Sequence, residues 1–360
     1  MPKDKNQKKK GLFEYARLPE ITEPLLKWYD ENARDLPWRK TTDPYKIWIS
    51  EIMLQQTRVD TVIPYFERFV QDIPTIQNLA ELPEQQLLKY WEGLGYYSRA
   101  RNLQKAAQMI VQHFNGVFPS AIKDIAQLPG IGSYSAGSIA SIAFGLPEPA
   151  VDGNVLRVMT RLAECSTNIA EPALKVQVAD ALRRIYPVNR ASAFTQALME
   201  LGATVCIPHG QAQCLLCPLN FCCTAYRHGS TGEYPVKEAA KSRKIEKMTV
   251  FHLICQDPEN RNLTALCRRP AKGLLAGLWQ FPWQSGHLTA EEIRVLMDTA
   301  KIEVSKITRK KSAKHIFSHI EWHMQVWQID CTRQSPDYVW VNEEQLHGEY
   351  AVPVAFRKTL

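Results

Sequence analysis

Apolar residues recur at helical spacing through most of the chain between residue 21 and about residue 225. This period of three to four residues, punctuated by proline and glycine, predicts a mostly helical region. The segments that follow the pattern are residues 22–34, 45–57, 86–92, 99–114, 133–144, 153–163, 172–185 and 192–205. We therefore expect this region to be an all-α domain.

The pattern changes after residue 226. Residues 227–246 contain Gly, Ser, Pro and several Lys without periodicity, which is typical of a linker. Beyond the linker, strand-like apolar segments cover residues 249–254, 263–267, 315–330 and 338–341, and a helical pattern covers residues 291–299. These elements predict a small α+β domain over residues 247–360.

Composition adds limits on partners and location. The chain has 360 residues, enough for two or three domains, and its net charge of +7 permits a nucleic-acid partner without requiring one. Residues 1–10 hold five lysines and one aspartate and are expected to form a basic disordered tail. We find no signal or transit peptide and no apolar run of the roughly 18 residues that a membrane span needs. A soluble, cytoplasmic protein without a membrane partner is expected.

Five of the nine cysteines lie within residues 206–223, and four of them carry a regular spacing. Cys206, Cys214, Cys217 and Cys223 have the spacing C-x7-C-x2-C-x5-C. Four such thiolates could hold one zinc ion or one iron–sulfur cluster, and unliganded thiols are the remaining alternative. Zinc sites more often combine two C-x2-C pairs, and only one is present. Because Cys222 adjoins Cys223, the spacing alone leaves the fourth ligand open.

Residues 128–155 carry the most informative motif. Gly130 and Gly132 form a tight turn before the helical pattern that starts near residue 133, and Asp152 follows Gly132 by twenty residues. Two glycines before a helix offer backbone N–H groups to an anion such as a DNA phosphate. A carboxylate brought near by the next loop could then act on the sugar. The alternative is an ordinary loop or helix-capping glycine.

A second acid, Glu51, lies among the apolar residues of the segment 49–54. In sugar hydrolases one carboxyl group protonates the leaving group and a second carboxylate stabilises the cationic sugar. Two carboxylates in different environments suit this pair of tasks, and an apolar setting raises the pKa of a carboxyl group. The alternatives are a solvent-facing glutamate at position 51 and a loop or N-cap residue at position 152.

Longer motifs carry a resemblance to a known family. Leu-Pro-Gly-Ile-Gly at 128–132 and Val-Asp-Gly-Asn-Val at 151–155 resemble the helix-hairpin-helix DNA glycosylases. Leu-Pro-Trp-Arg at 36–39, Ser-Glu-Ile-Met-Leu-Gln-Gln-Thr at 50–57 and Gly-Leu-Gly-Tyr-Tyr-Ser-Arg-Ala-Arg at 93–101 resemble the adenine DNA glycosylases of the MutY type. The resemblance covers essentially the whole chain.

The resemblance implies an architecture for the chain. It predicts a helix-hairpin-helix glycosylase domain of two helical lobes over residues 11–226, with an iron–sulfur loop at 206–223. Residues 247–360 would form a Nudix-like domain, because Gly-Leu-Trp-Gln-Phe-Pro at 277–282 resembles that family. The acidic helix that binds magnesium in active Nudix hydrolases is missing, so we expect lesion recognition here rather than nucleotide hydrolysis.

The resemblance also implies roles for individual residues. Glu51 would protonate adenine at N7 and then activate water. Asp152 would stabilise the oxocarbenium-like sugar, in one version through a covalent intermediate, and Tyr134 and Asn154 would support the two acids. The residues expected to line the adenine pocket are Arg34, Leu36, Trp38, Arg39 and Gln196. Those expected to contact DNA or the lesion are Gln56, Tyr96, Gly130, Gly132, Phe317, Ser318 and His319, with Tyr96 wedged into the base stack. Without the resemblance, Tyr96 and Trp38 would be core aromatics, Gln56 a surface amide and residues 317–319 a strand end.

One [4Fe–4S] cluster with a structural role is implied for the cysteines at positions 206, 214, 217 and 223. The first spacing is one residue longer than the usual C-x6-C of the family, and Cys223 is preferred over Cys222 because x5 fits the family. Position 134 holds tyrosine where endonuclease III-like enzymes carry the lysine that attacks the sugar. We therefore expect a monofunctional enzyme without efficient strand cleavage.

The expected function is hydrolytic removal of adenine opposite 8-oxoguanine, and more weakly opposite guanine, in duplex DNA by a monomeric enzyme. Three alternatives are a pyrimidine-lesion glycosylase with lyase activity, a lesion-binding module with inactive acids, and a nucleotide-pool hydrolase. The tyrosine at position 134 argues against the first alternative. The two intact acids argue against the second, and the missing magnesium-binding helix against the third.

Overall fold

The computed structural model describes residues 15–238, 242–256 and 262–360, so the expected basic tail lies outside it. The chain divides into two compact units, Met1–Glu81 with Asn102–Ala239 and Leu82–Arg101 with Ala240–Leu360. Within the described ranges, no helix is both long enough and apolar enough to cross a lipid bilayer.

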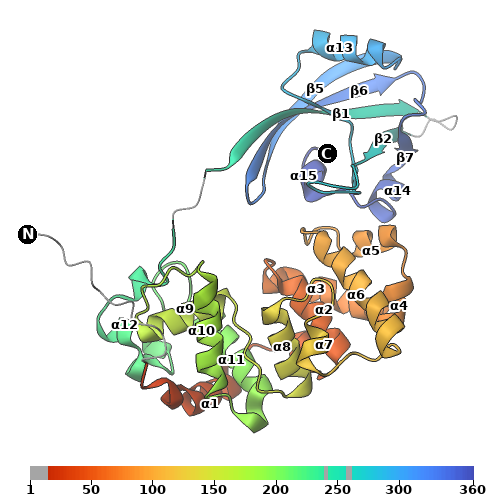
Figure 1. The fold of residues 1–360 in the computed structure, drawn as a ribbon. Coiled ribbons are helices and arrows are strands. Elements are labelled where there is room, and N and C mark those ends of the chain that lie inside the picture. Colours follow the sequence, from red (N-terminus) through yellow and green to blue (C-terminus); the bar gives the residue numbers. More distant parts are fainter. Residues whose placement is uncertain (1–14, 239–241, 257–261) are drawn as a thin grey trace, which may run out of the picture. The chain divides into compact units, whose positions relative to one another are not determined.

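The first unit is helical, as the apolar spacing predicts (Figure 1). Its helices are α1 (Thr22–Asn32), α2 (Pro44–Leu54), α3 (Val59–Asp72), α4 (Ile76–Glu81), the greater part of α6 (Ser98–Phe114), α7 (Ile122–Ile125), α8 (Ser133–Phe144), α9 (Gly153–Ala163), α10 (Pro172–Arg183), α11 (Ala191–Thr204) and α12 (Thr224–Arg227). The sequence pattern does not predict α3 and α4. The apolar face of α3 consists of Val62, Phe66 and Phe69 at helical spacing, but Pro64 interrupts the pattern.

Two groups of helices surround the site. One apolar core joins α1, α9, α10, α11 and the cysteine loop, with Phe194 and Leu201 of α11 fully buried in it. In the other group α2 packs against α3 and α8, around the fully buried Trp48. Since α11 also packs against α8, the first unit presents α2, α8, α9 and α11 to a common region.

Gly137 allows the close packing that places the second acid. A Cβ atom at this position of α8 would lie 2.3 Å from the carbonyl oxygen of Pro149, so any side chain would push the two segments apart. The chain then runs through the buried Ala150 and Val151 to Asp152. The small residues of α8 therefore bring the loop before α9 close to this helix.

The second unit is built on a seven-stranded sheet with the order β3-β2-β1-β6-β5, in which β4 also pairs with β1 and β7 with β2 (Figure 1). Only the pairing of β1 with β6 is parallel among the described strands. The strands are β1 (Lys244–Gln256), β2 (Asn262–Arg268), β3 (Trp279–Gln280), β4 (Trp283–Ser285), β5 (Val304–Ile316), β6 (Ile320–Cys331) and β7 (Val339–Val341).

Helices cover both faces of this sheet. Alternate residues of β1 belong to two apolar cores, Val250 to one and Phe251 to the other. Ile293 of α13 (Ala290–Thr299) contributes to the core with Phe251. On the opposite face the core with Val250 contains residues of α14 (Glu343–Gly348) and α15 (Val354–Arg357). This two-sided burial agrees with the expected α+β class.

The boundaries of two elements differ from the sequence expectation. The first strand begins at Lys244, inside the segment 227–246 that was expected to be a linker, because its backbone pairs with β6 from Ile320 onwards. Backbone pairing needs no apolar side chain, so the pattern misses these residues. The segment 315–330 is two strands, because residues 317–319 form a turn that the Phe317 N–H closes on the Ile320 carbonyl at 2.8 Å.

The second unit also contains α5 (Glu84–Tyr90) and the Gly-rich segment that follows it. The carboxylate of Glu92 accepts hydrogen bonds from the Val352 N–H and from Arg357, each at 2.8 Å. Residues 82–101 were expected to belong to the helical domain. These contacts explain why they group with the Nudix-like part instead.

Candidate active site and cysteine pocket

Glu51 is a buried acid on α2, only 5% exposed. Burial raises the pKa of its carboxyl group from 4.5 to about 7, and the negative charge of Asp152 adds to the rise. The Tyr134 hydroxyl donates a hydrogen bond to Oε2 at 2.9 Å and opposes the rise, as does the nearby Ser138 hydroxyl. A carboxyl group with this pKa can both give and take a proton near neutral pH.

Asp152 is the N-cap of α9. Its Oδ1 atom accepts the Val155 N–H at 2.8 Å, and its Oδ2 atom accepts the side-chain amide of Asn154 at 2.8 Å. Burial raises the pKa of Asp152, while these hydrogen bonds and the nearby Arg157 lower it. The carboxylate is therefore held at the start of a helix, where the dipole favours negative charge.

Further bonds fix the orientation of Asn154. Its Oδ1 atom accepts a hydrogen bond from Arg157 at 2.7 Å, and the same guanidinium donates to the carbonyls of Gly202 and Cys206, each at 2.7 Å. A Cβ atom at Gly202 would lie 2.5 Å from the Cβ of Asn154, so α11 must carry glycine here. Asn154 therefore fixes the position of the Asp152 carboxylate through its side-chain amide.

Both acids open onto one pocket of about 820 Å³ in the first unit. The pocket contains every residue that the sequence assigns to an adenine site. These are Arg34, Leu36, Trp38, Arg39 and Gln196, which lie beside Glu51, Tyr134, Asp152 and Asn154. Trp38 is also buried and makes an edge contact with Phe66. It therefore both packs in the core and lines the pocket.

Glu200 is a pocket residue that the sequence analysis missed. Its side chain is 1% exposed and accepts hydrogen bonds from Arg34 at 2.7 Å and Arg39 at 2.8 Å. Burial opposes its ionisation, but the two guanidinium groups outweigh burial and lower the pKa of Glu200 to about 2. One signal could have found it, because Glu200 follows Gln196 by four residues and shares its face of α11.

The glycine turn at residues 130–132 leads directly into α8. Gly130 has a φ of +80°, and a Cβ there would lie 2.7 Å from the Cβ of Asn102, so the turn requires glycine. Gly132 is the N-cap of α8, with a φ of −91° and open space around its missing Cβ. A side chain at this second position would meet no neighbouring atom, so packing alone does not require glycine there.

Gln56 and Tyr96 both have strained backbones. They adopt the left-handed region with φ of +58° and +46°, which residues other than glycine rarely occupy. Gln56 is exposed in the first unit, and Tyr96 is 48% exposed in the second unit, so Tyr96 is not a core aromatic. Asn115, Glu164, Leu275 and Lys301 share this conformation, so backbone strain alone does not mark a functional site.

The turn between β5 and β6 lies close to Tyr96 in the second unit. The hydroxyl groups of Tyr96 and Ser318 are hydrogen-bonded at 2.8 Å, and Ser318 is exposed. Phe317 packs edge-on against Trp322 with 4.8 Å between the ring centres, and the His319 carbonyl accepts the Lys244 N–H at 3.1 Å. Residues 317–319 thus form an anchored turn that exposes Ser318.

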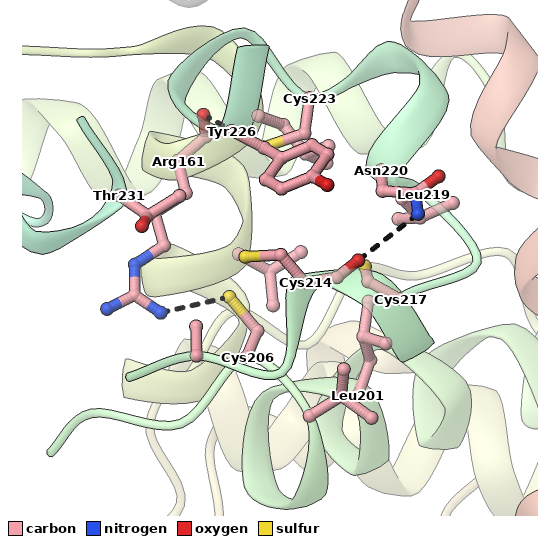
Figure 2. A pocket seen from close by; sticks show the side chains of 14 residues that line it. Arg161, Leu201, Cys206, Cys214, Cys217, Leu219, Asn220, Cys223, Tyr226 and Thr231 are labelled. Atoms are coloured by element: carbon pink, nitrogen blue, oxygen red, sulfur yellow. Dashed lines mark hydrogen bonds between the residues drawn. The ribbon is translucent and has the colours of Figure 1, made fainter. Parts of the chain in front are cut away.

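The four spaced cysteines surround one apolar pocket of about 390 Å³ (Figure 2). Cys206, Cys214, Cys217 and Cys223 all line it, although they come from different turns of the loop after α11. Cys222 is buried elsewhere, with its thiol directed to the Leu219 carbonyl at 3.4 Å.

The four thiols line the same pocket. Four cysteine side chains can serve as the ligands of a [4Fe–4S] cluster or of a zinc ion. In the described ranges no group of three or more metal-binding side chains is close enough together to hold one metal ion. Arg161 donates a hydrogen bond to the Cys206 sulfur at 3.2 Å (Figure 2).

Comparisons with known proteins agree with this geometry. Residues 49–187 match the family model of HhH-GPD superfamily base excision DNA repair proteins, and residues 249–360 match the NUDIX domain. The adenine DNA glycosylase of Rattus norvegicus is 33% identical over 367 residues, covering 87% of this chain and 70% of the relative. That of Buchnera aphidicola subsp. Baizongia pistaciae is 36% identical over 307 residues, covering 85% of each protein.

Solved structures support the fold of the helical part. A thermostable thymine-DNA glycosylase matches with a TM-score of 0.54 and 27% identity, over 59% of this chain and 98% of that one. A trapped endonuclease III–DNA covalent intermediate matches with a TM-score of 0.52 and 25% identity, over 59% and 97%. Together with the full-length relatives, these matches establish that the chain belongs to the adenine DNA glycosylases of the MutY type, within the HhH-GPD superfamily.

Proposed function

We propose that this protein hydrolyses the N-glycosidic bond of adenine in duplex DNA as a step of base excision repair. The observation that carries the proposal is the pairing of two differently placed acids in one pocket. Glu51 has a pKa of about 7, and Asp152 is held at a helix N-terminus. This division suits a general acid that protonates a leaving base and a carboxylate that stabilises the sugar cation.

The pocket supports a specific order of events. Protonated Glu51 gives its proton to N7 of an adenine that has left the base stack, and the glycosidic bond breaks. Asp152 stabilises the oxocarbenium-like sugar, and ionised Glu51 then takes a proton from the attacking water. Arg34, Arg39 and Glu200 form a fixed charged wall that can bind the polar edge of the flipped base.

The nucleophile in this mechanism is water. An amine that attacked the sugar would form a Schiff base and lead to strand cleavage. Position 134 offers a phenol, and no lysine is found among the described residues that line the pocket. We therefore propose a monofunctional glycosylase that leaves an abasic site. We also propose that the protein acts as a monomer.

The opposite base is proposed to be 8-oxoguanine or, more weakly, guanine. In the first unit the strained residue Gln56 is an exposed amide that can contact a displaced base pair. In the second unit Tyr96 offers an exposed ring for wedging, and Ser318 of the turn 317–319 offers a hydroxyl to the lesion. Backbone N–H groups of the Gly130–Gly132 turn would hold a DNA phosphate.

The direct test is a single-turnover assay on duplexes with adenine opposite 8-oxoguanine or guanine. Each time point is divided into an alkali-treated and an untreated half. We expect strand cleavage only after alkali, and faster with 8-oxoguanine. Cleavage in the untreated half would contradict the monofunctional assignment. Tight binding without cleavage in either half would favour a lesion-binding module, and excision of thymine or oxidised pyrimidines would favour the rival specificity.

We further propose that the cysteine pocket holds one [4Fe–4S] cluster through Cys206, Cys214, Cys217 and Cys223. The cluster would supply a covalent cross-link that fixes the loop after α11. Arg227 of α12, directly after this loop, is an exposed cation that could then face DNA. In this arrangement Arg157 and Arg161 join the loop to α9, because both donate to the backbone or sulfur of Cys206.

Serine substitution of Cys223 is expected to remove most of the bound iron and visible absorbance from the purified protein. Serine at Cys222 is the matched control, because that thiol lies outside the pocket and should leave about four irons per chain. Iron analysis together with the absorption spectrum measures both. If the Cys222 variant lost iron and the Cys223 variant kept it, the ligand assignment would be reversed.

A further inference from the structure

Ser138 of α8 has an unusual hydroxyl group. The residue is fully buried, yet its Oγ atom has no hydrogen-bond partner in the described structure. Buried hydroxyl groups are normally bonded, and an unbonded one calls for an explanation. Alanine would fill the same place in α8 without burying an unpaired polar group.

The neighbouring serines of α8 do not share this property. The Ser141 hydroxyl donates to the Ser138 carbonyl at 3.2 Å and accepts a hydrogen bond from Thr195 at 2.8 Å. The Ser135 hydroxyl accepts one from Gln55 at 3.1 Å. The missing partner is therefore a feature of position 138 and not of serine in this helix.

Position 138 lies next to the reacting acid. It follows Tyr134 by four residues and so lies one turn along the same face of α8. The Tyr134 hydroxyl already donates to Glu51. The Ser138 hydroxyl acts on both groups and lowers their pKa values, although it makes no hydrogen bond of normal geometry to either of them.

Other charged groups face Glu51 from the surrounding elements. Asp152 at the start of α9 is a negative charge that disfavours ionised Glu51. Glu200 of α11 lines the same pocket, but its charge is compensated by Arg34 and Arg39. Of these groups only Tyr134 and Ser138 can donate a hydrogen bond to the Glu51 carboxylate from α8.

In the proposed reaction, loss of its proton changes the number of hydrogen-bond donors that the Glu51 side chain requires. A protonated carboxyl group carries its own donor, and one hydrogen bond from Tyr134 suffices in its buried site. After the proton has moved to N7 of adenine, both oxygens are acceptors and only one is bonded to Tyr134. A serine hydroxyl can rotate and supply a second donor without any movement of the backbone.

We propose that Ser138 is a positioning residue. Its hydroxyl donates a hydrogen bond to the Glu51 carboxylate that forms when adenine takes the proton. This inference rests on the proposed glycosylase function. When water later returns a proton to Glu51, the hydroxyl is released again. No atom of Ser138 is exchanged with the substrate, so it acts only through Glu51.

The test is the pH profile of single-turnover adenine excision by the Ser138→Ala variant. The rate requires protonated Glu51, so in the wild type it falls as the pH rises through the pKa of Glu51. Loss of a donor to the ionised form raises this pKa, and the alkaline limb should therefore move to higher pH. The rate below the limb should fall about tenfold or more, as for a lost hydrogen bond to a charged group.

Stability provides a second readout that a purely structural role would not give. Ser138→Ala should melt at the same or a higher temperature, because it removes an unpaired buried hydroxyl, while it loses activity. The matched control is Ser141→Ala, which removes a bonded hydroxyl from the same helix. That variant should melt at a lower temperature and keep the wild-type pH profile. Ser138→Thr, which restores the hydroxyl, should restore the wild-type limb.

The outcomes separate the two proposals. If Ser138→Ala has the wild-type rate and pH profile while wild-type excision is normal, the role of Ser138 is refuted and the glycosylase function is retained. An identical shift of the alkaline limb in Ser141→Ala would also refute the role of Ser138, because the shift would then be a general effect of substitution in α8. If the wild-type protein excises no adenine, both proposals are wrong.

Discussion

Replacing Glu51 with glutamine is expected to reduce single-turnover adenine excision by about 10⁴-fold. Glutamine has nearly the same shape and can still accept the Tyr134 hydrogen bond, but it can neither protonate N7 nor take a proton from water. General acid–base groups typically contribute 10²- to 10⁴-fold, and Glu51 is expected to reach the upper limit because it acts in both steps. The measurement is the excision rate at saturating enzyme from pH 5 to pH 9.

The same substitution should stabilise the protein at alkaline pH. The folded-state pKa of Glu51 is raised from 4.5 to about 7. Its contribution to stability is therefore fully present below pH 4.5 and is lost as the pH rises through 7. At about 1.4 kcal/mol per pKa unit, this loss is about 3 kcal/mol, which a neutral glutamine avoids.

Equilibrium unfolding in urea at pH 5 and pH 8 measures this effect. We expect the difference in free energy of unfolding between the glutamine variant and the wild type to increase, in favour of the variant, from pH 5 to pH 8. An advantage of equal size at both would mean that ionisation of Glu51 is not the cause. A variant with wild-type excision would refute the assignment of the general acid.

Replacing Asp152 with asparagine is the prediction with the next largest effect. Asparagine is as good an N-cap as aspartate, so α9 should keep its start and the melting temperature should change little. The negative charge that faces the developing sugar cation is lost, however. Removal of one such electrostatic group typically costs about 10²- to 10³-fold, and we expect a loss of excision in this range.

Alanine at position 152 is the informative comparison. It removes both the charge and the cap, so it should lose activity and also about 1 kcal/mol of stability. Melting curves and single-turnover rates of the two variants then separate the two roles. Wild-type excision by the asparagine variant would mean that Asp152 serves only to cap α9.

The sequence predicts helices well where small or apolar residues recur without interruption. The bounds of α8 and α9 agree with the expected segments 133–144 and 153–163. By contrast, β5 is mostly polar and carries Lys306, Lys310 and Lys311, so no apolar pattern indicates it. Its place is determined by pairing with β6 over nearly its whole length, and such long-range pairing leaves no local signal.

Site residues that belong to long sequence motifs could be predicted. Site residues whose role depends on burial and tertiary contacts could not. The motifs bring Glu51 and Asp152 into one pocket with the five expected lining residues. Glu200 stands between Met199 and Leu201, and an acid in this setting is ordinarily assigned to the surface. Only the tertiary structure brings Arg34 and Arg39 to it. The unpaired hydroxyl of Ser138 is likewise visible only once its neighbours are in place.

In its proposed role as a phosphate site, the glycine turn before α8 would make part of the DNA affinity less sensitive to salt. Each lysine or arginine that contacts a phosphate displaces a condensed counterion, and affinity then falls steeply as the salt concentration rises. Gly130 and Gly132 present amide N–H groups and a helix dipole, which carry no whole positive charge. A phosphate held there displaces less of the ion atmosphere. The part of the affinity that this turn provides should therefore persist at salt concentrations that remove the contribution of the basic side chains.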